Sequence, residues 1–197
     1  GEGTTLNNIA GIYYARGDYD TAMDYFKQSL AIQREIGDRA SEGCEGIILN
    51  NIARIYDGKG DYDEALEYLN QSLAIRRKVG DCAGEGITLN NLAGIYETRG
   101  DYDMALDYFK QSLTIQKEVG DLDSMCPTLF NIGSIHMRHE ELREANTAFL
   151  AAYRIAKEIQ LTETLIHLEA LAQQMGQEGL SFWEERLEEM KAQNGES

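Results

Sequence analysis

The chain repeats a stretch of about 40 residues several times, and this repetition constrains its fold more than any other feature. The segment GEGTTLNNIAGIYYARGDYDTA begins at Gly1, GIILNNIARIYDGKGDYDEA at Gly46 and GEGITLNNLAGIYETRGDYDMA at Gly84. The asparagine that ends each LNN, or its counterpart, recurs after 43, 40 and 40 residues, at Asn8, Asn51, Asn91 and Asn131. A period of this length is typical of stacked supersecondary units, each of which buries an apolar face against its neighbour.

Each unit has the pattern of two helices separated by a glycine and an aspartate. In the first unit Leu6, Ile9, Ala10 and Tyr13 recur at the spacing of one helix face. Glycine favours the left-handed conformation that ends a helix, and aspartate favours the N-cap that begins the next. Such Gly-Asp pairs divide the chain at 17–18, 37–38, 60–61, 80–81, 100–101 and 120–121. The sequence therefore predicts an all-α fold of antiparallel helix pairs.

The residues at the packing positions resemble those of tetratricopeptide repeats. The matching residues are Leu6, Ile9, Ala10, Tyr13, Ala22 and Phe26, then Leu49, Ile52, Ala53, Tyr56, Ala65 and Leu69, then Leu89, Leu92, Ala93, Tyr96, Ala105 and Phe109, and more loosely Leu129, Ile132, Gly133, His136, Ala145 and Phe149. The long repeat is similar to that of kinesin light chains, Pins-type adaptors and arrays in prokaryotic signalling proteins. The resemblance implies a right-handed α-solenoid, the tetratricopeptide superhelix. The proline that often closes the standard repeat is missing.

The repeat boundaries suggest a domain organisation. We expect four helix pairs at 1–37, 38–80, 81–120 and 121–159, followed by a capping helix pair and tail at 160–197. The first helix is expected to be truncated, because residues 1–3 align with residues inside the first helix of the third unit. This alignment favours a fragment of a larger protein.

The last part of the chain is expected to close the array. Apolar residues keep helical spacing after position 160, and Ser181 stands three residues before Glu184. This spacing predicts a capping box that opens the last helix. Because a solenoid must cover the core of its last repeat, we expect Trp183 to pack on the array rather than to bind a ligand.

Asparagines occupy the face of each first helix that lies opposite the apolar face. Asparagine is a poor residue in mid-helix, so its recurrence there is unusual. In the resembled family this helix lines a concave groove, where asparagines hydrogen-bond the backbone of an extended peptide. The resemblance thus implies a peptide-binding groove formed by Asn8, Asn51, Asn91, Asn131, Asn50, Asn90, Arg54, Asp57, Glu97 and Arg138. Selectivity is expected from these charged residues together with Ile47, Ile87, Phe130 and Met137.

Two alternatives to the groove are a structural origin of the asparagines and inheritance without any role. The asparagines can form hydrogen bonds between neighbouring helices, or they can be inherited by recent duplication. The fourth unit is the most informative, because it has diverged at many positions. There the paired asparagine is replaced by Phe130, yet Asn131 is retained. This retention favours the groove.

Composition limits the partners. The net charge of −16 argues against nucleic acid and against an anionic membrane surface. No stretch approaches the roughly 20 apolar residues that span a bilayer, and no signal-like start is present, so a cytoplasmic location is expected. The three cysteines are expected to be free thiols at packed positions; a disulfide or zinc site is the alternative. No metal site is expected, because packing accounts for His136 and the helix dipole accounts for His139. No cofactor or enzymatic activity is expected either, because the sequence has no phosphate-binding glycine loop and no cysteine near a partner that would make it a nucleophile.

These observations favour a scaffold that binds an extended peptide or protein segment in its groove. One alternative is a structural array that forms homo-oligomers through the exposed apolar residues of its N-terminal repeat. Another is the ligand-sensor segment of a multidomain signalling protein, which rests on the resemblance alone.

Overall fold

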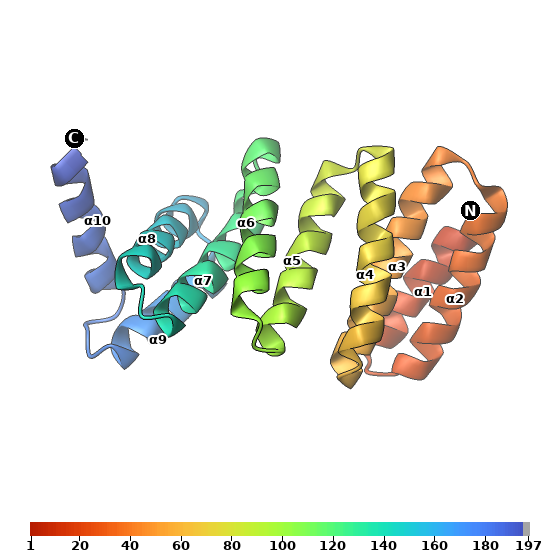
Figure 1. Cartoon of the computed structure of the whole chain (residues 1–197), viewed down its shortest axis with the longest axis horizontal. Coiled ribbons are helices and arrows are strands. Elements are labelled where there is room, and N and C mark those ends of the chain that lie inside the picture. Colours follow the sequence, from red (N-terminus) through yellow and green to blue (C-terminus); the bar gives the residue numbers. More distant parts are fainter. Residues whose placement is uncertain (195–197) are drawn as a thin grey trace. The chain divides into compact units, whose positions relative to one another are not determined.

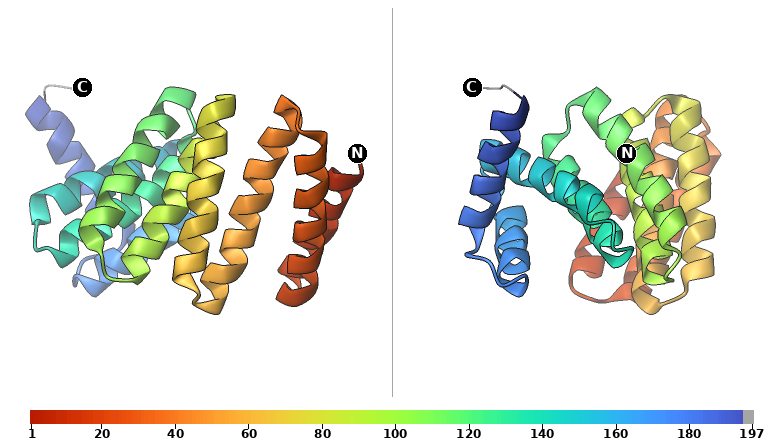
Figure 2. Two further views of the ribbon diagram at one scale, coloured as in Figure 1. Left: turned by 45° about the vertical axis from the view of Figure 1, so that its right-hand side comes forward. Right: turned by 60° about the vertical axis from the view of Figure 1, so that its left-hand side comes forward.

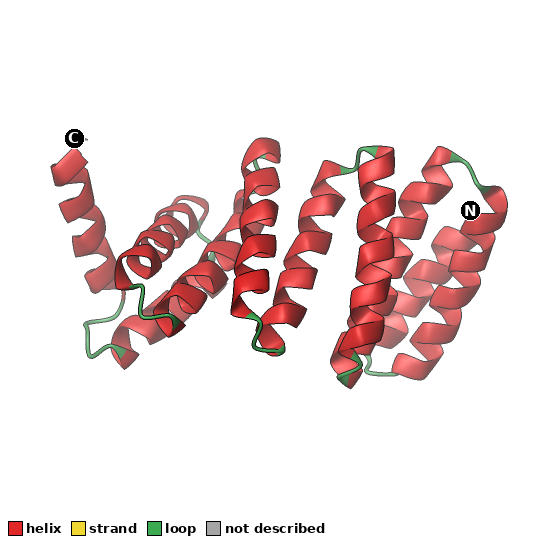
Figure 3. Cartoon of the chain, viewed as in Figure 1, coloured by secondary structure: helices red, strands yellow, loops and turns green. Residues whose placement is uncertain are grey.

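The computed structural model describes residues 1–194, in which the chain forms ten α-helices joined by short loops (Figures 1 and 3). No strand occurs among these residues. The helices are α1 (Glu2–Ala15), α2 (Tyr19–Ile36), α3 (Arg39–Lys59), α4 (Tyr62–Val79), α5 (Cys82–Thr98), α6 (Tyr102–Val119), α7 (Leu122–Arg138), α8 (Leu142–Ile159), α9 (Thr162–Gln174) and α10 (Leu180–Asn194). The predicted all-α fold of consecutive helix pairs is confirmed.

The chain divides into two compact units, and the boundary lies within α6, after Tyr108. In the first unit α1 packs on α2, α3 on α4, and each pair contacts the next. In the second unit α7 packs on α8, and α9 and α10 follow (Figure 2). The assignment of these helices to four repeats and a terminal cap remains a prediction.

The Gly-Asp pairs end and begin helices as predicted, although one aspartate makes no cap. Gly60 and Gly80 adopt positive φ angles of 83° and 75° at helix C-termini, where glycine is favoured because it has no Cβ. The Asp38 carboxylate accepts a hydrogen bond of 2.7 Å from the Ser41 amide, which caps α3. Asp61 occupies the equivalent place before α4, but its side chain makes no capping hydrogen bond.

Small residues stand where two helices cross closely. The Ala22, Ala65 and Ala105 side chains are fully buried, and Ala145 is 2% exposed. Most of the predicted packing residues are likewise buried, whereas Leu6 and Ile9 on α1 are only partly so. The helix crossings are therefore set by alanines, as the repeat pattern predicts.

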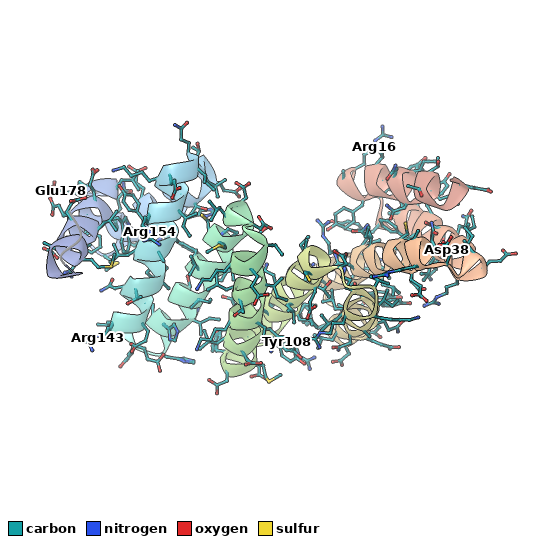
Figure 4. All side chains as sticks on the ribbon, turned by 90° about the horizontal axis from the view of Figure 1, so that it is seen from above. Arg16, Asp38, Tyr108, Arg143, Arg154 and Glu178 are labelled. Carbon is teal, nitrogen blue, oxygen red and sulfur yellow. The ribbon has the colours of Figure 1, made fainter. Side chains whose placement is uncertain are left out.

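Stacked tyrosines join the two helices of a pair in the first unit. The ring centres of Tyr56 and Tyr68 lie 5.4 Å apart, and those of Tyr96 and Tyr108 (labelled in Figure 4) lie 5.5 Å apart. In each case the two rings come from two different helices. Aromatic stacking thus joins consecutive helices within one turn of the crossing, because Tyr68 and Tyr108 each follow the buried alanine of the crossing by three residues.

Serine hydroxyls join the two helices of each pair in the first unit. Ser29 donates to the Gly3 carbonyl and Ser72 to the Gly46 carbonyl, both at 2.7 Å. A Cβ at Gly3 would lie 2.6 Å from the side-chain amide nitrogen of Gln33, so a larger residue at this position would displace the Gln33 side chain. The glycine therefore leaves room for Gln33 beside the serine hydrogen bond.

The last two helices cover the core of the second unit. Trp183 on α10 is fully buried, and its indole N–H donates to the Leu168 carbonyl at 2.7 Å. Its packing role is therefore confirmed. The predicted capping box is wrong, because α10 begins at Leu180 and Ser181 lies inside it. The Ser181 hydroxyl donates to the Glu178 carbonyl instead, at 2.6 Å.

The three cysteines are free thiols in different environments. Cys126 is fully buried, and burial raises the pKa of its thiol to about 11. This thiol is therefore protonated at neutral pH. Cys44 is half-buried, while Cys82 is exposed. The prediction of a packed position is wrong for Cys82, because it starts α5 directly after the N-cap Asp81.

Within residues 1–194, none of the helices has the length and apolar character that a bilayer-spanning segment requires.

Candidate functional site

The predicted asparagine face lies on the first helix of each pair. In the first unit α1 contacts α3, and α3 contacts α5, so these helices form one continuous surface. Asn8 is exposed, and Asn51 and Asn91 are half-buried. The exposed Ile47 and Ile87 belong to the same stripe. These three asparagines therefore lie outside the apolar core, whereas Asn50, which was predicted for the same groove, is buried at 6% exposure.

Side-chain amides on this surface are hydrogen-bonded between neighbouring helices. The Asn91 amide donates to the Asn50 side-chain oxygen at 2.9 Å, and Asn51 donates to Asn7 at 3.4 Å. This is the inter-helix bonding that the sequence left open as an alternative. Because a primary amide has two N–H groups and one carbonyl oxygen, each donor retains further bonding capacity. The bonds hold the amides in place without using all of it.

The charged residues predicted for the groove lie at several places on these helices. The Arg54 guanidinium carbon lies 4.8 Å from the centre of the Tyr14 ring, which is a cation–π contact across neighbouring helices. Burial raises the pKa of the Asp57 carboxyl, and the charge of Arg54 acts in the opposite direction. Asn90 and Glu97 are half-buried on α5. These groups therefore flank the asparagine stripe on α3 and α5.

The second unit contains a cavity of about 910 Å³ between α7 and α9. Two predicted groove residues, Asn131 and Arg138, line it together with Phe130 and Met137. The full lining is Asp123, Pro127, Phe130, Asn131, Ser134, Met137, Arg138, Leu161, Glu163, Thr164, His167, Ala170, Leu171 and Gln174. We refer to it as the α7–α9 cavity. The fourth asparagine thus faces a hollow.

The wall that α9 contributes was not predicted from the sequence. Glu163, His167, Ala170 and Gln174 are all exposed, and they recur at the spacing of one helix face. Only the opposite, apolar face of this segment entered the sequence prediction. The stripe that contains Asn131 on α7 has its counterpart in these residues, so helical spacing alone could have identified them.

Aromatic packing fixes the floor of the cavity. The Phe130 ring centre lies 5.4 Å from that of Phe149 and 5.7 Å from that of His167. Phe149 is almost fully buried and contacts Trp183, with ring centres 5.7 Å apart. Ser134 donates its hydroxyl to the Phe130 carbonyl at 2.9 Å. The lining of the cavity therefore combines a packed aromatic side chain, Phe130, with polar side chains.

The described residues hold no group of three or more His, Cys, Asp or Glu side chains placed to bind a metal ion. His136 is buried, and its Nδ1 lies 2.5 Å from the Glu141 carboxylate. The hydrogen bond from His136 lowers the pKa of Glu141. Since this contact joins the end of α7 to the start of α8, it accounts for His136 as part of the packing.

The repeated helix pairs match a known family in sequence. The family model described as tetratricopeptide repeat matches residues 1–78, 44–118 and 84–158. These overlapping ranges cover the first eight helices almost completely. No curated protein matches the chain in sequence.

Three solved structures illustrate the likeness in fold. Aspartyl phosphate phosphatase F from Bacillus subtilis has a TM-score of 0.77 and 18% identity, over 82% of this chain and 43% of that one. A putative kinesin light chain from Podosopora anserina with nearly identical repeats has a TM-score of 0.67 and 20% identity, over 98% of this chain and 96% of that one. The Rap conjugation gene regulator of plasmid pLS20, solved with the Phr* peptide, has a TM-score of 0.71 and 13% identity, over 83% of this chain and 44% of that one. This chain thus spans less than half of the first and third structures, and the likeness concerns the fold.

Proposed function

The chain belongs to the tetratricopeptide repeat family, and from this premise we propose that it is a protein-interaction scaffold. In this proposal it binds an extended segment of a partner protein, and the α7–α9 cavity is the principal binding site.

The observation that carries the proposal is the cavity itself. Its volume of about 910 Å³ lies within the range of roughly 300–1,000 Å³ that is typical of ligand sites. An apolar wall surrounded by a few polar groups is the usual composition of such sites. Asn131 is one of the lining residues, and its amide can pair with a peptide backbone.

Magnitudes assign separate tasks to the two kinds of residue. An amide hydrogen bond contributes roughly 0.5–1.5 kcal/mol, whereas association costs about 4–15 kcal/mol. Asn131 can therefore fix the register of a bound chain but cannot supply the affinity. The apolar wall around Phe130 must supply most of it. The pLS20 regulator was solved with a peptide, which supports this class of ligand for the fold.

The test uses a random-sequence peptide library displayed on phage and selected against the full chain. Ala170→Trp fills the cavity from α9, while Ala74→Trp places the same side chain on α4; both alanines are exposed. Peptides selected on the unmodified chain should bind Ala74→Trp normally and Ala170→Trp at least about tenfold more weakly, measured by fluorescence anisotropy. Equal binding to both variants, or no selected peptide at all, would contradict the proposal.

A further inference from the structure

The α7–α9 cavity differs from the asparagine face of the first unit at one wall position. Asn7 and Asn50 occupy that position in the first two pairs, and each accepts a hydrogen bond from an asparagine on the first helix of the next pair. The fourth pair has Phe130, whose ring is half-buried and backed by Phe149. An aromatic ring held by fixed packing is a good contact for an apolar ligand side chain. The wall therefore favours a ligand with an apolar anchor.

One end of the cavity is rich in hydrogen-bond acceptors. Asp123 and Glu163 stand in the first turns of α7 and α9, and both line the cavity. Opposite charges attract most strongly where the surrounding surface partly excludes water. The two carboxylates thus favour a cationic group at this end.

The opposite end carries the other sign of charge. Arg138 stands in the last turn of α7 and also lines the cavity. Fifteen residues of helix separate it from Asp123, which corresponds to about 22 Å. The two ends of the cavity therefore carry opposite charges, and a basic ligand group is favoured only at the end formed by Asp123 and Glu163.

We propose that the cavity selects a peptide segment in which a bulky apolar side chain lies about three residues from a lysine or arginine. Seven residues of helix separate Phe130 from Asp123, or about 10 Å. An extended peptide covers this distance in about three residues, at roughly 3.3 Å each. The basic side chain points to the first turns of α7 and α9. This inference rests on the proposed function.

Charge argues for a basic partner rather than a second copy of this chain. The chain carries a net charge of −16, so a second copy would bring further negative charge to the end formed by Asp123 and Glu163. Such an encounter is repulsive, whereas a basic segment is attracted by the same field.

The test is a positional-scanning peptide array probed with the full chain. Each peptide fixes one apolar and one charged position at a chosen separation, and the other positions are mixtures. The strongest signal should come from leucine or phenylalanine three residues from lysine or arginine. Replacing the basic residue by glutamate should weaken binding by at least about twofold to fivefold. This loss of binding should be smaller at high salt, because salt screens the charges.

Two variants assign the preference to the cavity. Glu163→Lys changes an exposed residue and should reduce or invert the preference for a basic residue. Phe130→Asn restores the residue found in the other pairs and should reduce binding of the apolar anchor at least about fivefold. Unchanged circular dichroism verifies the fold, and if Phe130→Asn fails to fold, Glu163→Lys alone decides.

The outcomes separate this inference from the function on which it rests. One outcome is peptide binding that is abolished by Ala170→Trp and yet shows no preference for a basic residue. That result overturns the inference and leaves the proposed function intact. Absence of any binding overturns both. Self-association of the unmodified chain in sedimentation, abolished by Ala170→Trp, would assign the cavity to a second copy and overturn the inference as well.

Discussion

The α3–α4 pair of the first unit and the α7–α8 pair of the second make the same fold with different contacts. In the first, Ser72 donates to the Gly46 carbonyl. In the α7–α8 pair the corresponding residues are Cys126 and Ala152, which follow Gly86 and Ser112 of the third pair by forty residues. The Cys126 thiol lies 3.9 Å from the Ala152 carbonyl oxygen. The first helix of this pair thus carries a larger side chain at the contact, and the second helix a smaller one. At this contact the two substitutions compensate each other in volume.

The same comparison applies to the ends of the pairs. The stacked Tyr56 and Tyr68 rings of the first unit give way to His136 and its contact with Glu141 in the second. Glu140 takes the left-handed position that glycine occupies elsewhere, with φ of 61°. What stays constant is the buried alanine at the helix crossing, Ala65 in one pair and Ala145 in the other. The close approach of the two helices is therefore kept in both pairs, while the contacts around it differ.

The largest expected effect separates the two units. Trp183→Ala removes a fully buried side chain that contacts Phe149, and such a truncation costs about 3–5 kcal/mol. Because repeat arrays are stabilised by nearest-neighbour contacts, the loss should concentrate in α8, α9 and α10. Hydrogen exchange followed by mass spectrometry should accelerate there and remain unchanged in α1 to α4. Uniform acceleration along the chain would contradict this independence.

A smaller effect tests the fourth pair by restoring the residue of the others. Ala53 and Ala93 occupy in the earlier pairs the position of Gly133. A Cβ at Gly133 would lie 2.7 Å from the Phe149 ring, so Gly133→Ala should destabilise the chain by roughly 1–3 kcal/mol in urea unfolding.

Gly94→Ala is the matched control for this substitution. A Cβ at Gly94 on α5 meets nothing within 4 Å, so alanine should stabilise the helix by about 0.5–1 kcal/mol. The two identical substitutions are therefore expected to have opposite signs. Equal destabilisation by both would show that Phe149 is not the cause.

The smallest effect sharpens the idea of compensating pairs. Cys126→Gly alone should be destabilising, since it leaves a void beside α8. Adding Ala152→Ser supplies a hydroxyl that can donate to the carbonyl of residue 126, as Ser72 does for Gly46. The double variant should be more stable than the sum of the single effects by about 0.5–1.5 kcal/mol in a double-mutant cycle. Simple additivity would argue against compensation.

Local signals predicted much of this structure. The turns follow from glycine and aspartate because their conformational preferences act within a few residues, and the crossings follow from alanine because helix approach is limited by side-chain volume. Asp61 shows the limit of this reasoning, since its side chain makes no capping hydrogen bond although Asp38 and Asp81, which also follow a glycine, both make one.

Non-local contacts were harder to predict. The sequence placed Asn51 on the correct face, but its hydrogen bond to Asn7 depends on the offset between neighbouring helices. The cavity wall on α9 was missed because α9 has lost the repeat residues that identified the other first helices. Its exposed stripe through His167 was present in the sequence, but without a repeat to mark it.

The central claim, that a peptide lies between α7 and α9, is tested most directly by photo-cross-linking. A peptide selected on the full chain and carrying a photoreactive side chain is irradiated in the complex, and the adducts are located by mass spectrometry. We predict adducts within 123–138 and 161–174, which Ala170→Trp abolishes and Ala74→Trp does not. Adducts confined to α4, α8 or α10, unaffected by Ala170→Trp, would contradict the account.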